Sequence, residues 1–389
     1  MLIIVEESFT PQKNLLSSLK VPFSVNIPII ISGTIVLGVA IVGGIIILQR
    51  RFRSTKKDSS VYSSQLSTTR NFKKLYYPGL RNIGNSCYLN CILQALASAR
   101  PVLIANETLH TRPFILELHG LLSVLNTPQT YATSYDAKIL VSQMGGVLNG
   151  EQQDAHELLQ AILSVLSKDI MKNRSSDSLG VEDLRIPSIS HTYSSSSGAF
   201  SKEYHHIPWE GILMTKIQCT CCGKTSGSGT RAIDFSILTL QLADTLIDSF
   251  HTTFAPDHLS GYQCANCLLT DGCYKIEGIV RWPKILILHL QRSIASGGML
   301  VKDDRYVKFP LIFSNWNWQC YQIIIEQKCP SYKLCAIVEH LGSLGGGHYV
   351  TYRRVNGDAW LCCSDTSITA VPLARVLRAN AYILLYTKS

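Results

Sequence analysis

The longest apolar stretch of the chain lies near its N-terminus. Residues 27–48 carry no charged side chain, and these 22 residues are enough for a helix to cross the hydrocarbon core of a bilayer. A signal peptide would have a shorter apolar core followed by a small-residue cleavage site, whereas Gln49 and Arg50 follow here. With a buried soluble helix as the alternative, the pattern predicts a transmembrane helix over residues 27–48.

Basic residues are distributed unevenly around this stretch. Lys13 and Lys20 precede it, and a basic cluster follows it: Arg50, Arg51, Arg53, Lys56 and Lys57. The positive-inside rule therefore places the C-terminal part of the chain in the cytosol. We expect residues 1–26 to be an N-terminal tail and the basic and serine-rich residues 49–74 to be a flexible tether. Such an anchor suits the mitochondrial outer membrane and the endoplasmic reticulum equally.

After the tether the hydrophobic pattern changes twice. Apolar residues recur at helical spacing over 114–125 and 156–166, and from residue 207 onward short runs rich in β-branched residues predict strands. The serine-rich residues 173–199 between these halves predict an exposed insertion. The sequence thus predicts an α+β domain over residues 75–389, helical in its first half and mainly sheet in its second.

Composition narrows the classes of function. With 46% hydrophobic and 16% charged residues, the chain can bury a sizeable core. The formal net charge is +9, but the basic residues beyond the N-terminal cluster are dispersed, so nucleic-acid binding is not favoured. The cysteines number 13, an odd count, and four of them form two Cys-x-x-Cys pairs. That pattern favours metal binding in a reducing compartment over disulfides.

One cysteine stands where a glycine-rich turn meets an apolar helical run. The segment GLRNIGNSCYLNCILQAL covers residues 79–96, and apolar residues recur at helical spacing after Cys87. Cys87 is thus predicted at a helix N-terminus, where free N–H groups and the helix dipole favour the thiolate. Although a buried structural cysteine is the alternative, this context makes Cys87 a candidate nucleophile.

A histidine with matching chemistry follows three glycines. The segment GGGHYVT, residues 345–351, places His348 at the head of a predicted strand. Because glycine lets a substrate backbone approach closely, His348 is the candidate general base. The stretch WLCCSDT follows an Asn-Gly turn signal, which predicts a neighbouring antiparallel strand and brings Ser364 or Asp365 beside His348. A thiol protease needs a group that orients the imidazole, and the pattern leaves open which of the two serves.

The two cysteine pairs are a candidate metal site. They are Cys219 with Cys222 and Cys264 with Cys267, with 41 residues between the pairs. Four thiolates suit tetrahedral zinc, and a site with four protein ligands is closed and structural. Weighed against four ordinary thiols, the doubled spacing predicts one structural zinc ion.

Five motifs together resemble those of ubiquitin-specific proteases. They are GLRNIGNSCYLNCILQAL, EQQDAHELL at 151–159, PKILILHLQR at 283–292, GGGHYVTY, and AYILLY near the end. The motifs occur in the family's order. The resemblance implies a papain-like cysteine protease core with a helical thumb over about 79–205, zinc-ribbon fingers over about 206–280 and a β-sheet palm over about 281–389.

The resemblance also implies roles in thiol-dependent hydrolysis at the C-terminal glycine of ubiquitin. Cys87 would be the nucleophile, His348 the base and Asn82 the side-chain donor to the oxyanion, with a plain turn asparagine as the alternative for Asn82. At the third triad position the family shows aspartate or asparagine before a second aspartate, whereas this chain has Ser364 before Asp365. We assign Ser364 as the orienting group and keep Asp365 as the second candidate.

Serine at the third triad position is a feature of one branch of the family. That branch includes a member of the mitochondrial outer membrane with a single N-terminal anchor. The resemblance thus implies a membrane-anchored deubiquitinase, with the mitochondrial outer membrane as first choice and the endoplasmic reticulum as second, that opposes ubiquitin-driven mitophagy. An inactive ubiquitin-binding scaffold and a protease for another ubiquitin-like modifier are the competing hypotheses.

Ubiquitin and ubiquitinated proteins are the implied partners. In the family, the face that carries Gln153 and Asp154 borders the channel for ubiquitin's basic C-terminal tail, so the Asp154 carboxylate is expected to pair with its arginines. An ordinary solvated helix face is the alternative for these polar residues. Gly346, Gly347 and Tyr349 are expected to line the passage for its terminal glycines. The catalytic domain is expected to be monomeric and to need no catalytic cofactor.

Overall fold

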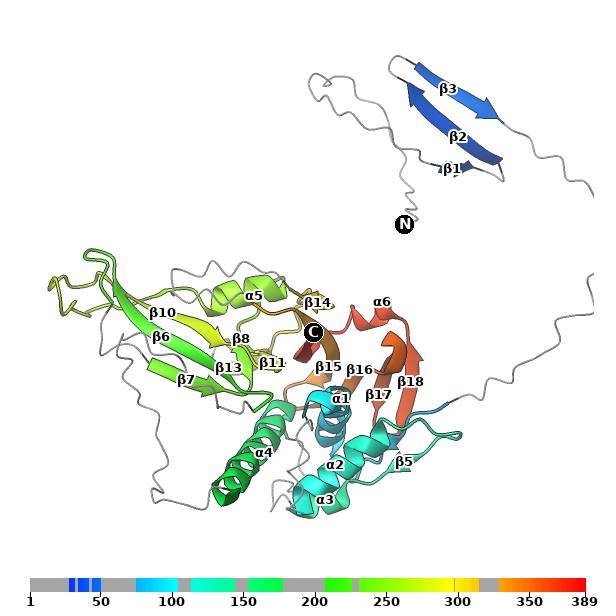
Figure 1. The fold of residues 1–389 in the computed structure, drawn as a ribbon, viewed down its shortest axis with the longest axis horizontal. Helices are drawn as coiled ribbons and strands as arrows, with labels where there is room; N and C mark the ends of the chain where they lie inside the picture. The colour runs from blue at the N-terminus through cyan, green and yellow to red at the C-terminus, as the bar shows by residue number, and fades with distance from the viewer. Residues whose placement is uncertain are drawn as a thin grey trace, which may run out of the picture. The chain divides into compact units, whose positions relative to one another are not determined.

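The computed structural model describes residues 28–31, 34–41, 44–49, 75–103, 113–143, 153–177, 207–225, 231–296, 298–314 and 329–389. The chain divides into two units, residues 1–72 and 73–389. Figure 1 shows the helices and strands of each unit.

In the first unit the described residues form a three-stranded antiparallel sheet. Its strands are β1 (Pro28–Ile31), β2 (Thr34–Ile41) and β3 (Gly44–Gln49), with β2 in the middle. The prediction of a helix over residues 27–48 is therefore wrong for this structure. Isoleucine and valine dominate the strands, and their β-branched side chains favour extended backbone. No helix in the described part of the chain is long and apolar enough to span a membrane.

An eight-stranded sheet, the palm, forms the centre of the second unit. Its strands in chain order are β8 (Leu238–Leu240), β11 (Ile285–Leu290), β14 (Ile312–Phe313), β15 (Tyr332–Ser343), β16 (Gly346–Arg354), β17 (Trp360–Ser364), β18 (Ser367–Val371) and β19 (Ala381–Lys388). In space they run β18-β17-β16-β15-β19-β11-β8, and β14 pairs with β15. All neighbours are antiparallel except β8 and β11. Every residue of β11 is buried, as expected of a strand covered on both faces.

The thumb is helical, and its helix α1 (Cys87–Leu103) packs against this sheet. Its other helices are α2 (Pro113–Leu125), α3 (Lys138–Gln143) and α4 (Ala155–Asp177), and a short parallel strand pair joins β4 (Gly79–Leu80) to β5 (Ser134–Tyr135). Helix α1 contacts α2 and α4 and also β15, β16 and β17. Because it is covered from several sides, α1 is apolar over most of its surface. The few polar residues that it buries are therefore informative.

The fingers form a separate antiparallel ribbon that runs out from the palm (Figure 1). Its strands, in the order β7-β6-β10-β9, are β7 (Arg231–Phe235), β6 (Gly211–Cys219), β10 (Cys273–Arg281) and β9 (Asp257–His258). Strands β6 and β10 pair along their whole length, which ends with Cys219 opposite Cys273.

Short elements complete the unit. They are α5 (Leu246–Thr253), the hairpin β12 (Ser293–Ser296) and β13 (Met299–Lys302), the 3-10 turn η3 (Asn356–Asp358) and α6 (Leu373–Val376). Helix α5 is capped at its N-terminus by Thr245, whose side chain accepts a hydrogen bond from the backbone N–H of Asp248. The predicted α+β architecture, helical first and mainly sheet afterwards, is confirmed.

Candidate active site

Cys87 is the first residue of α1 and is 4% exposed. The turn before it is organised by Asn82, whose Oδ1 accepts hydrogen bonds from the backbone N–H groups of Gly84 and Ser86, each at 3.1 Å. Gly84 has a φ of +105°, a conformation that glycine adopts without strain. This turn fixes where α1 begins and puts Cys87 in the first helical turn, whose N–H groups have no acceptor within the helix and where the helix dipole favours a thiolate.

Cys91, one helical turn further on, is a different kind of cysteine. Its Sγ lies 3.0 Å from the carbonyl oxygen of Tyr88, and burial raises the pKa of its thiol well above the ordinary value. A thiol that resists ionisation is a poor nucleophile. The backbone of Cys91 also anchors the helix to the palm, because Oγ1 of Thr351 donates to its carbonyl oxygen at 2.8 Å.

His348 and Ser364 meet across two neighbouring strands. Strand β16 pairs antiparallel with β17, and Nε2 of His348 lies 2.8 Å from Oγ of Ser364. Since Ser364 engages Nε2, Nδ1 is the ring nitrogen that can exchange a proton with a thiol. The structure thus puts Ser364 in hydrogen-bond contact with the imidazole, at the position that the sequence leaves open.

Asp365 faces the nucleophile's turn instead. Its Oδ2 accepts a hydrogen bond from Nδ2 of Asn82 at 3.0 Å, and its Oδ1 accepts one from Nδ2 of Asn90 at 2.8 Å. The residue has a φ of +50°, in the left-handed region that aspartate tolerates better than most residues. The adjacent residues Ser364 and Asp365 therefore hold two different groups, the imidazole and the Asn82 amide.

Asn90 is a site residue that the sequence analysis does not single out. It lies on α1 with only 2% of its surface exposed, among leucine, isoleucine and alanine residues. Besides its bond to Asp365, its Nδ2 donates to the carbonyl oxygen of Arg81 at 3.2 Å. A buried amide on an apolar helix is the signal that could have identified it, because burying such a group without partners is costly.

Gly79 lets the start of the domain approach this turn. A Cβ at Gly79 would lie 2.6 Å from Cα of Thr366 and 2.8 Å from the carbonyl oxygen of Asp365, so no larger residue fits there. The next residue, Leu80, donates its backbone N–H to that same carbonyl oxygen at 2.9 Å. The first strand of the catalytic unit, β4, is thereby bonded to the residue that follows Ser364.

Asp154 directly precedes α4 and caps its N-terminus. Its Oδ1 accepts the backbone N–H of His156 at 2.7 Å, and its carbonyl oxygen accepts that of Leu158 at 3.1 Å. The Asp154 carboxylate also accepts the hydroxyl of Tyr382, at 2.7 Å from each oxygen. Gln153 precedes it and is partly exposed. The predicted tail-binding carboxylate thus has a structural role as well.

Gly346, Gly347 and Tyr349 lie at the start of β16, on either side of His348. A Cβ at Gly347 would collide with the carbonyl oxygen of Leu341 on β15, whereas Gly346 has open space around it. The ring of Tyr349 lies 6.1 Å from that of Tyr382, between centroids. Packing against β15 therefore explains one of the two glycines.

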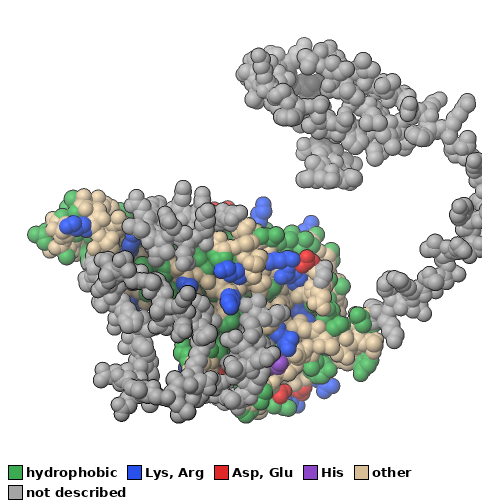
Figure 2. All heavy atoms as spheres, viewed as in Figure 1, with side chains coloured by type: hydrophobic (Ala, Val, Ile, Leu, Met, Phe, Trp, Pro, Cys, Tyr) green, Lys and Arg blue, Asp and Glu red, His purple; other side chains and the backbone are tan. Residues whose placement is uncertain are grey.

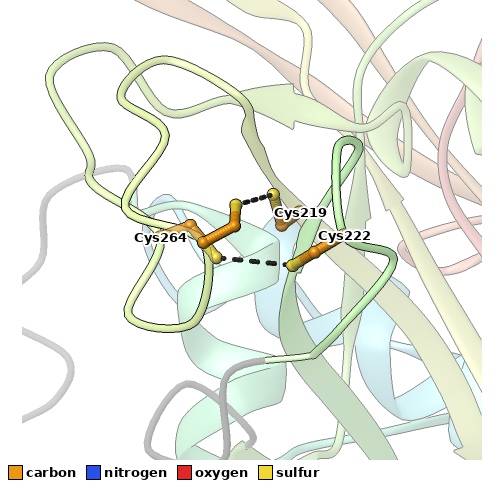
Figure 3. Close-up of side chains that lie close together, drawn as sticks. Cys219, Cys222 and Cys264 are labelled. Carbon is orange, nitrogen blue, oxygen red and sulfur yellow. Dashed lines mark hydrogen bonds between the residues drawn. The ribbon is translucent and has the colours of Figure 1, made fainter.

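The four predicted metal ligands come together at the end of the ribbon, and Figure 3 labels three of them, Cys219, Cys222 and Cys264. Cys219 and Cys222 lie at the end of β6 and Cys264 and Cys267 in the loop before β10, and their sulfur atoms all lie within 4.8 Å of one another. The sulfur atoms of Cys219 and Cys267 are 3.6 Å apart, and those of Cys222 and Cys264 are 3.7 Å apart.

These distances suit zinc. A tetrahedron with Zn–S bonds of about 2.3 Å has sulfur atoms about 3.8 Å apart. Backbone N–H groups of Cys267 and Asn266 lower the pKa of Cys264 to about 6, which favours the thiolate that binds metal.

Apolar side chains gather at this end of the ribbon (Figure 2), among them Leu268 and Leu269 at 66% and 43% exposure.

Comparison with known proteins finds similarity to ubiquitin carboxyl-terminal hydrolases. The sequence model of the ubiquitin carboxyl-terminal hydrolase family matches residues 78–386. Ubiquitin carboxyl-terminal hydrolase 25 of Arabidopsis thaliana is 28% identical over 337 residues, which cover 80% of this chain and 47% of that protein. Human ubiquitin carboxyl-terminal hydrolase 3 is 27% identical over 385 residues, which cover 86% of this chain and 72% of the relative. The chain therefore spans about half of the first relative and about three quarters of the second.

Solved structures share the fold. The Ubp8-containing SAGA DUB module bound to monoubiquitin superposes with a TM-score of 0.61 at 24% identity, covering 80% of this chain and 69% of that one. A second structure of the module, bound to ubiquitin aldehyde, gives a TM-score of 0.59 at 23% identity, with 80% and 69% covered. The fold over this part of the chain is thus one that solved structures contain.

Proposed function

The chain belongs to the ubiquitin carboxyl-terminal hydrolase family, and from this premise we propose that it is a thiol-dependent deubiquitinase. The proposed reaction is hydrolysis of the isopeptide or peptide bond at the C-terminal glycine of ubiquitin. One observation carries it. Asn82, in the turn before Cys87, is hydrogen-bonded to Asp365, and His348 is hydrogen-bonded to Ser364, the residue just before Asp365. Two adjacent residues thus link the turn of the nucleophile to the base.

Acylation uses Cys87 and His348. The Cys87 sulfur attacks the carbonyl carbon of ubiquitin's terminal glycine, and His348 takes the thiol proton through Nδ1. The bond to the lysine nitrogen then breaks, and the imidazolium returns the proton to the leaving amine. Ser364 holds Nε2 throughout and fixes the plane of the ring.

The oxyanion of the tetrahedral intermediate is held from the nucleophile's side. Asn82 uses one Nδ2 hydrogen to bond Asp365, and its second hydrogen remains for the oxyanion, together with N–H groups at the start of α1. Water then attacks the thioester with His348 as base, which releases ubiquitin and restores the thiol. The partly exposed Asp154 is proposed to pair with the arginines of ubiquitin's tail.

A ubiquitin probe with a C-terminal electrophile tests this function. We expect a covalent adduct at Cys87, found by peptide mass spectrometry, and no adduct with the same probe built on another ubiquitin-like modifier. Binding without an adduct would support the inactive scaffold instead. Reaction with the other modifier alone would identify a different substrate.

Ser364→Ala is expected to lower kcat by about 10- to 100-fold, because the imidazole loses the group that holds Nε2. KM should change little, since Ser364 acts on the ring and not on ubiquitin. Steady-state kinetics with a ubiquitin–fluorophore conjugate measure both constants. Ser364→Asn, which keeps a hydrogen-bonding group, is the matched variant and should retain more activity. Near-normal turnover in Ser364→Ala would show that His348 is oriented by another group.

We also propose that zinc holds the fingers in the shape that receives ubiquitin. Chelation, or Cys264→Ser, is expected to raise KM at least about tenfold, because the loops of the ribbon lose their cross-link. The alkylation rate of Cys87 by iodoacetamide should not change. Cys221→Ser, at an exposed cysteine outside the cluster, is the control. A purified chain that contains no zinc and is insensitive to chelator would contradict the assignment.

Membrane attachment through residues 27–48 is proposed as well. The support is the absence of charge over this stretch and the basic cluster behind it. A single apolar segment inserted in a bilayer can pair all its backbone N–H and C=O groups only as a helix, so insertion requires these residues to leave the strands β1–β3. We propose the mitochondrial outer membrane as the site, since Ser364 and an N-terminal apolar segment together resemble ubiquitin carboxyl-terminal hydrolase 30, and opposition to mitophagy as the role.

Imaging of residues 1–75 fused to a fluorescent protein tests the location. Retention of the fusion in the membrane pellet after alkaline carbonate extraction would show insertion. A diffuse signal would exclude the anchor, and an endoplasmic reticulum pattern would exclude the mitochondrial assignment. Sedimentation of residues 75–389 tests the further proposal that the catalytic unit acts as a monomer.

A further inference from the structure

Four residues form a closed circuit of contacts between the start of α4 and the palm sheet. We call Asp154, His156, His289 and Tyr382 the Asp154 circuit. The rings of His156 and His289 stack, with centroids 4.0 Å apart and planes 9° from parallel. The ring of His289 meets that of Tyr382 edge-on, at 4.9 Å and 89°. The Tyr382 hydroxyl then donates to the Asp154 carboxylate, which in turn accepts the backbone N–H of His156.

The palm holds its two members of the circuit rigidly. His289 lies on β11 and Tyr382 on the neighbouring strand β19, and both are at most 9% exposed. Nδ1 of His289 lies 3.1 Å from Oγ1 of Thr239 on β8. A ring fixed by a strand neighbour and by a stacking partner can set the position of the aromatic ring that it touches.

The two imidazoles are uncharged at neutral pH. Burial and the nearby His156 lower the pKa of His289 to about 3, and burial also lowers that of His156. The carboxylates of Asp154 and Glu157 act to raise the pKa of His156, but burial outweighs them. The carboxylate of Asp154 likewise acts to raise the pKa of His289 and is also outweighed. Two stacked imidazolium ions would repel each other strongly at 4.0 Å. The circuit therefore carries a single charge, on Asp154.

That charge has no basic partner within the described residues. The salt bridges among the described residues involve other carboxylates, and the Asp154 carboxylate accepts hydrogen bonds from the Tyr382 hydroxyl and from the backbone N–H of His156. A carboxylate oxygen can accept more than one hydrogen bond, so Asp154 can still receive a guanidinium group. The direction in which it does so depends on where Tyr382 holds it.

We propose that His156 and His289 are positioning residues that orient Asp154, through Tyr382, toward the basic tail of ubiquitin. The inference rests on the proposed function, because it takes ubiquitin's tail as the ligand of Asp154. It assigns the two histidines to substrate recognition and not to proton transfer. They act through the shape and neutrality of their rings, so a ring of another kind at position 156 should preserve the effect.

The test compares two substrates across a small set of variants. One substrate is a ubiquitin–fluorophore conjugate, and the other is the same conjugate with citrulline in place of the tail arginines. We expect His289→Leu and His156→Leu to raise KM for the first substrate about tenfold with kcat within about twofold, and to leave KM for the second unchanged. His156→Phe should have a KM for the first substrate much closer to the wild-type value than His156→Leu has. His251→Gln, on α5 outside the circuit, is the control.

A double-mutant cycle separates this inference from the function on which it rests. Asp154→Asn should raise KM for the first substrate, and adding His289→Leu to it should have no further effect. If Asp154→Asn raises KM but the histidine variants do not, the positioning role is overturned and the proposed function stands. If the histidine variants impair both substrates equally and lower the melting temperature, the circuit only supports the fold. If the wild-type chain turns over neither substrate, both proposals fail.

Discussion

Replacing Cys87 with alanine is expected to reduce turnover of a ubiquitin–fluorophore conjugate by at least about 10⁴-fold, while the Kd for ubiquitin stays within about threefold of the wild-type value. Cys91, the next thiol on α1, cannot substitute, because it is buried and burial raises its pKa well above the ordinary value. The effect should lie in kcat alone, since the side chain forms a bond to the substrate only after binding. Stopped-flow turnover and isothermal titration calorimetry measure the two quantities.

Cys91→Ala is the matched control for this variant. It removes a sulfur one helical turn away, from the hydrophobic core, where the Cys91 Sγ lies 3.0 Å from the carbonyl oxygen of Tyr88. We expect turnover within about threefold of wild type and a modest fall in melting temperature, because a small cavity is left. Residual activity in Cys87→Ala, or equal losses in both variants, would contradict the assignment of the nucleophile.

Asp365→Asn is expected to lower kcat by about 100-fold with little change in KM. The native carboxylate accepts hydrogen bonds from both Asn82 and Asn90, whereas an asparagine amide offers one acceptor oxygen and one donor group. One of the two amides must then turn away. If Asn82 is displaced, the oxyanion loses a donor that is typically worth about 10²–10³-fold in rate. Asparagine tolerates a φ of +50°, so the backbone turn should survive the change.

A double-mutant cycle identifies the group through which Asp365 acts. If it holds the oxyanion amide, Asp365→Asn combined with Asn82→Ala should be no slower than Asn82→Ala alone. The pH dependence of kcat should stay as in wild type, because His348 keeps its bond to Ser364. Additive losses, or a displaced pH profile, would instead indicate that Asp365 acts on the imidazole.

The local pattern of the sequence predicts the palm well and the links between its distant parts poorly. The Asn-Gly signal correctly predicts that the strand with His348 and the strand with Ser364 are neighbours, because a tight turn leaves few other arrangements. The bond from Asn82 to Asp365 spans 283 positions. No periodicity or turn residue encodes such a contact, which depends on how α1 packs against the sheet.

The stretch 28–49 shows a different reason for error. Its freedom from charge fits a membrane helix, but its isoleucine and valine residues favour strands, and the structure has strands. A window of hydropathy records how apolar a segment is and not which backbone conformation it adopts.

The paired cysteines are predictable from the sequence, since their spacing and their chemistry indicate the same site.

The place of β19 has a consequence for the order of events during synthesis. β19 lies between β15 and β11, so these two strands cannot be joined in one sheet until residue 388 has left the ribosome. Translation adds about 5–20 residues per second. The strand that carries His348 is therefore made before the sheet that must hold it. A growing chain that already displays Cys87 would stay inactive toward ubiquitin until the sheet closes.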